Sequence, residues 1–233
     1  MRNFSKWIIE ETSDYIIINK PPLLSSLEDR KTGHDILTLA RDYLPEAKVC
    51  HRLDKETSGV MVLSKNDEAY RNLSIQFEKR EVLKVYHAIA EGIPAKKKFS
   101  VDKKLLKKGS EVIVHPDGKP SQTSMEVLEV YKKHTLVECL PKTGRMHQLR
   151  VHLAYAGHPI IHDSLYGGKP LLLSSIKPKY NLKKWTEEEP VSKRIALHAC
   201  SISFKDLMGN MTKYESPYPK DFKALVNQLG KNK

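Results

Sequence analysis

A run of charged and ionisable side chains stands directly before an apolar segment in residues 49–66, VCHRLDKETSGVMVLSKN. In this run Asp54 lies between Arg52 and Lys55, and a Thr-Ser-Gly turn signal separates it from the apolar residues that follow. An Asp before a strand most often stabilises a turn. A catalytic Asp would instead need a partner that keeps it ionised while it is partly buried, because desolvation raises the pKa of a carboxyl group. Both interpretations of Asp54 remain open at this point.

A candidate partner lies in the segment GRMHQLRVHLAYAGHP, which predicts a helix from about residue 145 to residue 156. At 100° per residue, Arg150 falls at the edge of an apolar stripe, and much of the opposite side is apolar too. An Arg on such a helix needs an anion, and the two candidates are a phosphate and a carboxylate such as that of Asp54. The alternative is an Arg whose head group reaches solvent.

A third candidate is Tyr86, in the segment KVYHAIAEG, where it shares one face of a predicted strand with Lys84. A single Tyr in a strand is usually a packing residue with a satisfied hydroxyl. In a protein that binds RNA, the same ring is also a platform on which a base stacks. The residue type alone does not separate these two roles.

Charge is the strongest compositional signal, because the chain has 40 basic and 28 acidic residues and therefore a net charge of +12. Residues 79–110 alone contain ten basic and three acidic side chains. Such a window releases counterions from a phosphate backbone, so nucleic acid is the first partner to consider. The alternative is a lysine-rich surface that is merely solvated.

Other features of the chain exclude several classes of protein. No apolar run approaches the roughly 20 residues that a membrane span needs. The three cysteines are widely spaced, which suits a reducing cytoplasm better than a disulfide framework. No CxxC pair or close Cys/His cluster has the spacing of a zinc site. We therefore expect a cytoplasmic protein with no membrane span and no bound metal.

The order of the predicted elements indicates the fold class. We expect strands at about 7–9, 15–19, 60–63, 83–92 and 194–204, two strands within 123–144 joined near 132–134, and helices at about 32–45, 66–82, 145–156 and 219–229. Residues 169–193 are expected to form a surface loop. Because strands and helices do not alternate, the pattern favours an α+β fold with a largely antiparallel mixed sheet and flanking helices.

Taken together, the segments HRLDKETSGVMVLSKN, KVYHAIAEG and TGRMHQLRVHLAYAGHPIIHDSLYG closely resemble, in this order, the three motifs of the RluA-type pseudouridine synthases. The segment IALHACSISF resembles the strand that follows in that family. By this resemblance the catalytic Asp is Asp54, the active-site Tyr is Tyr86, and the basic residue that pairs with the Asp is Arg150. Arg52 corresponds to the Arg that is thought to enter the space left by an extruded base.

The resemblance implies an RNA pseudouridine synthase that isomerises uridine in structured ribosomal or transfer RNA. We expect one catalytic domain over residues 1–233 without a separate N-terminal RNA-binding domain, acting as a monomer. Isomerisation involves no redox change, so neither a cofactor nor a metal is demanded. Whether Asp54 attacks the base, attacks the sugar or accepts a proton stays open. The residues assigned to RNA binding, besides Arg52, are Arg145, His147, Lys96, Lys97 and Lys98.

Two other functions are weighed against this one. The first is a catalytically silent RNA-binding protein on the same fold, which would not require the Asp54, Tyr86 and Arg150 set to be intact. The second is a metal-dependent phosphoesterase, whose candidate ligands are His51, Asp54, His147, His152, His162, Asp163 and His198. Against it, no HExxH-type spacing is present, and histidines five residues apart point to different faces of a helix.

Overall fold

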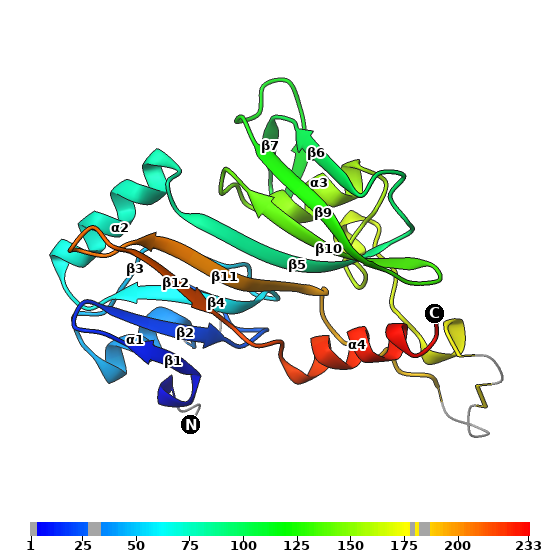
Figure 1. Cartoon of the computed structure of the whole chain (residues 1–233), viewed down its shortest axis with the longest axis horizontal. Helices are drawn as coiled ribbons and strands as arrows, with labels where there is room; N and C mark the ends of the chain where they lie inside the picture. Colours follow the sequence, from blue (N-terminus) through cyan, green and yellow to red (C-terminus); the bar gives the residue numbers. More distant parts are fainter. Residues whose placement is uncertain (1–3, 28–33, 178–179, 182–186) are drawn as a thin grey trace. The chain divides into compact units, whose positions relative to one another are not determined.

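The computed structural model of the chain describes residues 4–27, 34–177, 180–181 and 187–233. The chain divides into two compact units (Figure 1). The first unit comprises Met1–Tyr86 and His198–Tyr218, and the second comprises His87–Leu197 and Pro219–Lys233. The strands β5 and β11 each contribute residues to both units. The expected organisation as one catalytic domain stays a prediction.

The first unit is built on a mixed sheet. Its strands are β1 (Ile8–Glu11), β2 (Tyr15–Lys20), β3 (Lys48–Val49), β4 (Ser58–Ser64), the first part of β5 (Leu83–Glu91), most of β11 (Leu197–Lys205) and β12 (Met211–Glu215). They follow the order β1-β2-β4-β11-β5, with β3 beside β4 and β12 beside β11. The pairing of β11 with β4 is parallel, whereas β2 pairs with β1 and β4 in antiparallel fashion. This confirms the α+β fold with a mixed sheet.

Two helices cover the strands of the first unit. Helix α1 (Ile36–Tyr43) begins where the Asp35 side chain accepts a hydrogen bond from the Thr38 N–H. Helix α2 (Asp67–Lys79) is capped in the same way by Asn66. Such caps satisfy backbone donors that the first helical turn leaves unpaired. Both helices bury small and aliphatic residues in the same core cluster as β2 and β4.

Strand β4 is the centre of this core, since all seven of its residues are buried. At its start, Gly59 has φ +120°, and a Cβ on it would lie 2.2 Å from the carbonyl oxygen of Ala199. The parallel pairing of β4 with β11 therefore requires a residue without a side chain at this position. The glycine that ends the polar run of residues 51–59 thus sets the close approach of two central strands.

The second unit carries a separate set of strands. In it, the remainder of β5 continues the order β5-β10-β9-β6 through β10 (His134–Pro141), β9 (Gln122–Val130) and β6 (Lys98–Asp102). The strands β7 (Leu105–Lys108) and β8 (Glu111–Val114) form a hairpin. The helices are α3 (Gln148–Tyr155) and α4 (Lys220–Gly230), with short 3-10 turns at Ser164–Tyr166 and Leu173–Ser175. The pair β9 and β10 matches the two strands expected in residues 123–144.

Helix α3 begins at Gln148, three residues later than the sequence predicts. The Gln148 side-chain oxygen accepts hydrogen bonds from the Thr143 hydroxyl at 2.7 Å and from the Arg145 N–H at 3.0 Å. Its amide nitrogen donates to the Gln122 carbonyl and to the Thr123 hydroxyl, both at 3.0 Å. The first two bonds hold residues 143–145 as a turn, and the other two tie Gln148 to β9. His147, with φ +53°, adopts a left-handed conformation that an α-helix does not accommodate.

Other differences from the predicted elements have local causes. Residues 4–7 form a 3-10 turn, so the first strand starts at Ile8 rather than at residue 7. The sequence pattern did not predict β3, β6, the β7–β8 hairpin and β12, because strands of two to five residues are too short to show a clear period of two. Of the predicted loop 169–193, residues 178–179 and 182–186 lie outside the described part. No helix in the described ranges is long and apolar enough to cross a membrane.

The Gly59 contact yields the first prediction. Gly59→Ala should lower the free energy of unfolding by about 4 kcal/mol, because a methyl group meets the backbone of the neighbouring strand. Gly209→Ala is the matched control, since Gly209 also has a positive φ but has no atom within 4 Å of an added Cβ. It should cost about 1–2 kcal/mol of backbone strain. Urea unfolding measures both values, and equal losses would contradict the proposed contact.

Candidate active site

Asp54 lies in the loop between β3 and β4, and its neighbours along the backbone are held tightly. The Ser26 hydroxyl donates to the Leu53 carbonyl at 2.7 Å and accepts from the Leu53 N–H at 3.0 Å. The Thr57 N–H closes a turn by donating to the Asp54 carbonyl at 3.0 Å. Ser26 is buried, so solvent does not compete for these bonds. The half-buried Asp54 side chain is therefore presented by a rigid backbone.

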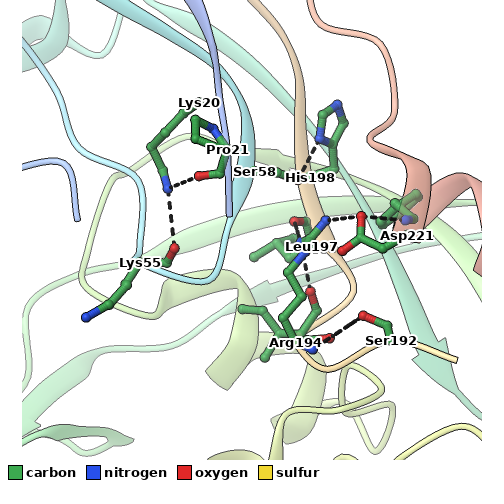
Figure 2. Close-up of polar contacts among 11 residues, drawn as sticks. Lys20, Pro21, Lys55, Ser58, Ser192, Arg194, Leu197, His198 and Asp221 are labelled. Carbon is green, nitrogen blue, oxygen red and sulfur yellow. Dashed lines mark hydrogen bonds and ion pairs between the residues drawn. The ribbon is translucent and has the colours of Figure 1, made fainter. Parts of the chain in front are cut away.

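Lys20 contacts the same loop at Lys55 (Figure 2). Its side chain is fully buried, and its ammonium group donates to the carbonyl oxygens of Pro21 at 2.9 Å, Leu24 at 2.8 Å and Lys55 at 3.3 Å. Hydrogen bonds from a charged donor are stronger than neutral ones. Lys20 thus ties the segment after β2 to the residue that follows Asp54.

Neither Lys20 nor Ser26 was identified from the sequence pattern. A Lys at the end of a buried strand, directly before two prolines, was the available signal, because a charge at such a position needs partners. Nothing in the pattern around Ser26 indicates its contact with Leu53, which lies 27 residues away.

His51 stabilises the loop rather than offering a free base. Its Nε2 accepts a hydrogen bond from the Val62 N–H at 3.0 Å, and its ring stacks on Phe77 at a centroid distance of 5.0 Å. Burial, together with the charge of Lys84, lowers the pKa of His51 to about 3. The ring is therefore neutral at physiological pH and fastens the loop to β4. Burial also lowers the pKa of Lys84 to about 8.

Tyr86 lies in the same unit as Asp54 and packs against its core cluster. Burial raises the pKa of Tyr86, and the negative charge of Asp54 raises it further. The phenol therefore keeps its proton at neutral pH and is able to donate it in a hydrogen bond. The structure places Asp54 and Tyr86 within electrostatic reach of each other. Arg52, two residues before Asp54, is exposed, and its contact with RNA stays a prediction.

In the second unit, Arg150 forms a two-fold ion pair with Asp163. The Nε and Nη2 atoms of Arg150 each lie 2.7 Å from one carboxylate oxygen of Asp163. The side chains of Arg150 and Asp163 are only 7% and 1% exposed. The expected need for an anion is confirmed, and solvent exposure of the guanidinium is excluded. The sequence pattern did not identify Asp163 as this anion.

The predicted pairing of Arg150 with Asp54 stays a prediction. The Asp163 contact does not by itself replace it, because a guanidinium carries five N–H donors and the fork uses two of them. Asp163 orients the group and balances its charge.

Tyr166 connects Arg150 to the β7–β8 hairpin. The Tyr166 ring lies 4.9 Å from the Arg150 guanidinium carbon, in cation–π geometry. Its hydroxyl accepts from the Val112 N–H at 3.0 Å and bonds His147 Nδ1 at 2.8 Å. His147, assigned to RNA binding from the sequence, therefore takes part in a contact within the protein. Its contact with RNA stays a prediction.

The basic window of residues 79–110 is divided between the units. Lys79, Arg80 and Lys84 belong to the first unit, and the lysines of 96–108 belong to the second. Lys97 and Lys98 approach Glu126 at 3.5 and 3.1 Å, but both stay largely exposed. Exposed ion pairs of this kind are weak, so these lysines remain able to exchange Glu126 for a phosphate.

The residues proposed for a metal site do not assemble into one. Among the described residues, no three His, Cys, Asp or Glu side chains are grouped to hold a metal ion. His198 is buried and bonds the Ser58 hydroxyl at 3.0 Å and the Ser216 carbonyl at 3.1 Å. His152 bonds the Thr123 hydroxyl at 2.8 Å. These histidines serve the cores of their own units, which argues against the phosphoesterase alternative.

Comparisons with known proteins decide the family. Residues 14–155 match the RNA pseudouridylate synthase family. A ribosomal large subunit pseudouridine synthase D of Haemophilus influenzae is 34% identical over 95% of this chain and 70% of its own length. The chain belongs to the RluA-type RNA pseudouridine synthases. It is thus an isomerase that converts uridine in RNA to pseudouridine.

Two further matches agree with this assignment. A ribosomal large subunit pseudouridine synthase C of Salmonella typhi is 32% identical over 95% of this chain and 69% of its own length. The structure of human RNA pseudouridylate synthase domain containing 4 covers 97% of this chain and 94% of its own, with a TM-score of 0.79 and 24% identity. The likeness to the human protein confirms the pseudouridine synthase fold.

The buried ion pair yields the second prediction. Asp163→Asn should lower the free energy of unfolding by about 3–5 kcal/mol, because it leaves the Arg150 charge buried without its carboxylate. Glu189→Gln, in the exposed pair of Glu189 with Lys193, is the control and should cost less than about 1 kcal/mol. Chemical denaturation of both variants tests this. A loss for Asp163→Asn no greater than that of the control would show that the pair does not carry the stability assigned to it.

Proposed function

We propose that the protein isomerises one or more specific uridines in structured ribosomal or transfer RNA, with Asp54 as the catalytic carboxylate. The observation that carries this proposal is the Asp54 loop, held by Ser26 and Lys20 on either side of the reacting group. The names of the relatives from Haemophilus influenzae and Salmonella typhi favour ribosomal RNA as the first substrate to test.

The reaction breaks the bond between the sugar C1′ and N1 of uracil and forms a bond between C1′ and C5. The base loses the hydrogen on C5 and gains one on N1, so atoms and electrons balance without an oxidant or reductant. For this reason the proposed mechanism needs neither a cofactor nor a metal. An ionised Asp54 serves each of the three roles left open, which are attack on the base, attack on the sugar and acceptance of a proton.

The other proposed site residues act around the same uridine. The target uridine must leave the RNA stack, at a cost of a few kcal/mol. Tyr86 offers a ring on which the extruded base stacks and a protonated phenol that donates a hydrogen bond. Arg52 enters the space that the base leaves. In the proposed mechanism, Arg150 pairs with Asp54.

We further propose that the protein works as a monomer in the cytoplasm, with residues 1–233 as one catalytic domain and RNA as its partner. The state of the cysteines supports the cytoplasmic assignment, because Cys50, Cys139 and Cys200 are all free thiols.

Asp54→Asn tests the catalytic assignment. The amide keeps the shape of the carboxylate but cannot act as the nucleophile or accept a proton, so turnover should fall at least about a hundredfold. Asp42→Asn, at an exposed site of α1, should leave turnover unchanged. Pseudouridine formation on transcribed ribosomal RNA gives the rate. Full turnover by a folded Asp54→Asn variant would remove Asp54 from this role.

The substrate itself is identified in cells. Pseudouridines mapped position by position in total RNA, with and without the gene, should differ at one or a few sites. A site in ribosomal RNA supports ribosomal RNA as the substrate. A site in transfer RNA supports transfer RNA instead. If no site changes, the proposed activity on both kinds of RNA is wrong.

The basic window predicts a steep salt dependence of RNA binding. If about five phosphates are neutralised, log affinity should fall against log salt with a slope near −4. Reversing Lys96, Lys97 and Lys98 to Glu should make the slope clearly shallower. Filter binding between low and physiological salt measures it. An unchanged slope would mean that these lysines are only a solvated surface.

A further inference from the structure

A pocket of about 360 Å³ opens in the second unit between the β7–β8 hairpin, the turn of residues 117–119 and the segment Gly144–Met146. Its volume lies within the range of about 300–1,000 Å³ that is typical of ligand sites. None of the groups assigned to the chemistry, namely Asp54, Tyr86 and Arg150, is among its lining residues.

The floor of the pocket is apolar. Leu105 and Val112 are buried there and pack with Val151 of α3, while Met146 and Leu106 are half-buried and face the open space. A flat aromatic ligand gains by covering such a floor, because half-exposed apolar groups leave water when it binds.

The rim of the pocket is positively charged. Lys107, Lys119 and Arg145 line it, against the single carboxylate of Asp117 among its lining residues. The Asp117 side chain is 85% exposed, and its backbone N–H donates to His115 Nδ1 at 3.3 Å. Three cations around an apolar floor suit a ligand that combines a planar ring with a negatively charged backbone.

The pocket is also preformed. Leu105 and Lys119 exchange backbone hydrogen bonds of 2.9 and 2.8 Å, which fix one wall to the floor. Between Asp117 and Lys119, Gly118 comes so close to the Leu105 backbone that an added Cβ would lie 2.5 Å from it. The Nε atom of Arg145 donates to the Pro120 carbonyl at 3.4 Å, which holds its guanidinium beside this wall.

We propose that this pocket binds one unpaired nucleotide of the RNA substrate, at a position other than the target uridine. The base of this nucleotide lies on Leu106 and Met146. The adjacent backbone phosphates contact Lys107, Lys119 and Arg145. Asp117 accepts a hydrogen bond from an N–H at the edge of the base. The inference rests on the proposed function, because it takes the substrate to be structured RNA. It extends that function by naming a recognition site for a second, extruded nucleotide.

The pocket is connected to Arg150 through Val112 and Tyr166. Val112 lines the pocket, and its N–H donates to the Tyr166 hydroxyl, whose ring covers Arg150. A nucleotide on the hairpin thus contacts the same framework that orients the Arg150 guanidinium. A substrate that fills the pocket would bind to the hairpin while the hairpin and α3 keep the arrangement seen in the structure.

Photochemical cross-linking locates the nucleotide. Wild-type protein is irradiated with the RNA in which its pseudouridine maps, carrying 4-thiouridine at single positions of the unpaired segments. One position, distinct from the target, should cross-link to a peptide that contains Leu106 or Met146. Cross-links confined to peptides outside 105–119 and 144–146 would overturn the proposal.

Affinity measurements then separate the base from the phosphates. An abasic site at the cross-linked position should weaken binding to the wild type on the order of tenfold, as loss of one stacked base does. Leu106→Glu should weaken binding of the intact RNA similarly and should be insensitive to the abasic change. Leu106→Ala, a milder variant, should retain part of the sensitivity. If the abasic change and Leu106→Glu act independently, the base does not lie on this floor.

The cations give a separate readout. Lys107→Gln together with Lys119→Gln should make the slope of log affinity against log salt shallower by about 1.4, as expected for two contacts to a single strand. Lys223→Gln, at an exposed site of α4, should leave the slope unchanged. A double variant that matches this control would overturn the phosphate contacts.

The outcomes also distinguish this inference from the function on which it rests. If wild-type protein forms no pseudouridine in ribosomal or transfer RNA, the proposed function fails, and the pocket proposal fails with it. If the wild type forms pseudouridine but the pocket variants bind RNA as the Lys223→Gln control does, only the pocket proposal fails.

Discussion

Charged groups that leave water must find opposite charge or hydrogen bonds inside the protein, and this constraint organises both units. In the first unit, the buried ammonium of Lys20 is met by three backbone carbonyls. In the second, the guanidinium of Arg150 is met by Asp163 and that of Arg194 by Asp221. Each of these contacts involves a segment that takes no part in strand pairing. Each one therefore holds in place a loop or helix that the sheet does not hold.

For the proposed chemistry, the consequence is that a rigid backbone holds Asp54 in position. The proposed mechanism uses no metal or cofactor, so it depends on the position of the protein's own side chains, with most of the rate enhancement coming from orientation and electrostatics. The Lys20 and Ser26 contacts meet that need through the backbone and leave the Asp54 carboxylate available. His51 adds a further attachment as a neutral ring, since its pKa is lowered to about 3.

In the second unit, a similar set of contacts fixes the orientation of Arg150. Asp163 binds two of its N–H groups, Tyr166 covers its face, and Gln148 sets the start of the helix that carries it. The same Tyr166 hydroxyl accepts from the β7–β8 hairpin. A basic hairpin and an oriented guanidinium are therefore parts of one framework, which relates the proposed RNA contacts of the hairpin to the geometry of a proposed catalytic residue.

The sequence by itself determined the family, the α+β class and most of the longer elements. Strand β4 and helix α2 carry strong local patterns of burial and capping, so their positions are readable from adjacent residues. The motif around Asp54 and the need of Arg150 for an anion were also local properties. The start of α3 was predicted three residues too early, because the Gln148 contacts that end the turn reach back to residues 122 and 123.

What only the tertiary structure decided was the choice of partners. Ser26 lies 27 residues from Leu53, and Lys20 lies 35 residues from Lys55, so no periodicity joins them. Asp163 stands 13 residues beyond Arg150, across a turn and a short irregular segment, and the sequence pattern did not identify it as a partner. A local pattern states that a buried charge needs a partner. Which group supplies it depends on how distant segments pack, because the hydrogen bonds form only once the chain has brought those segments together.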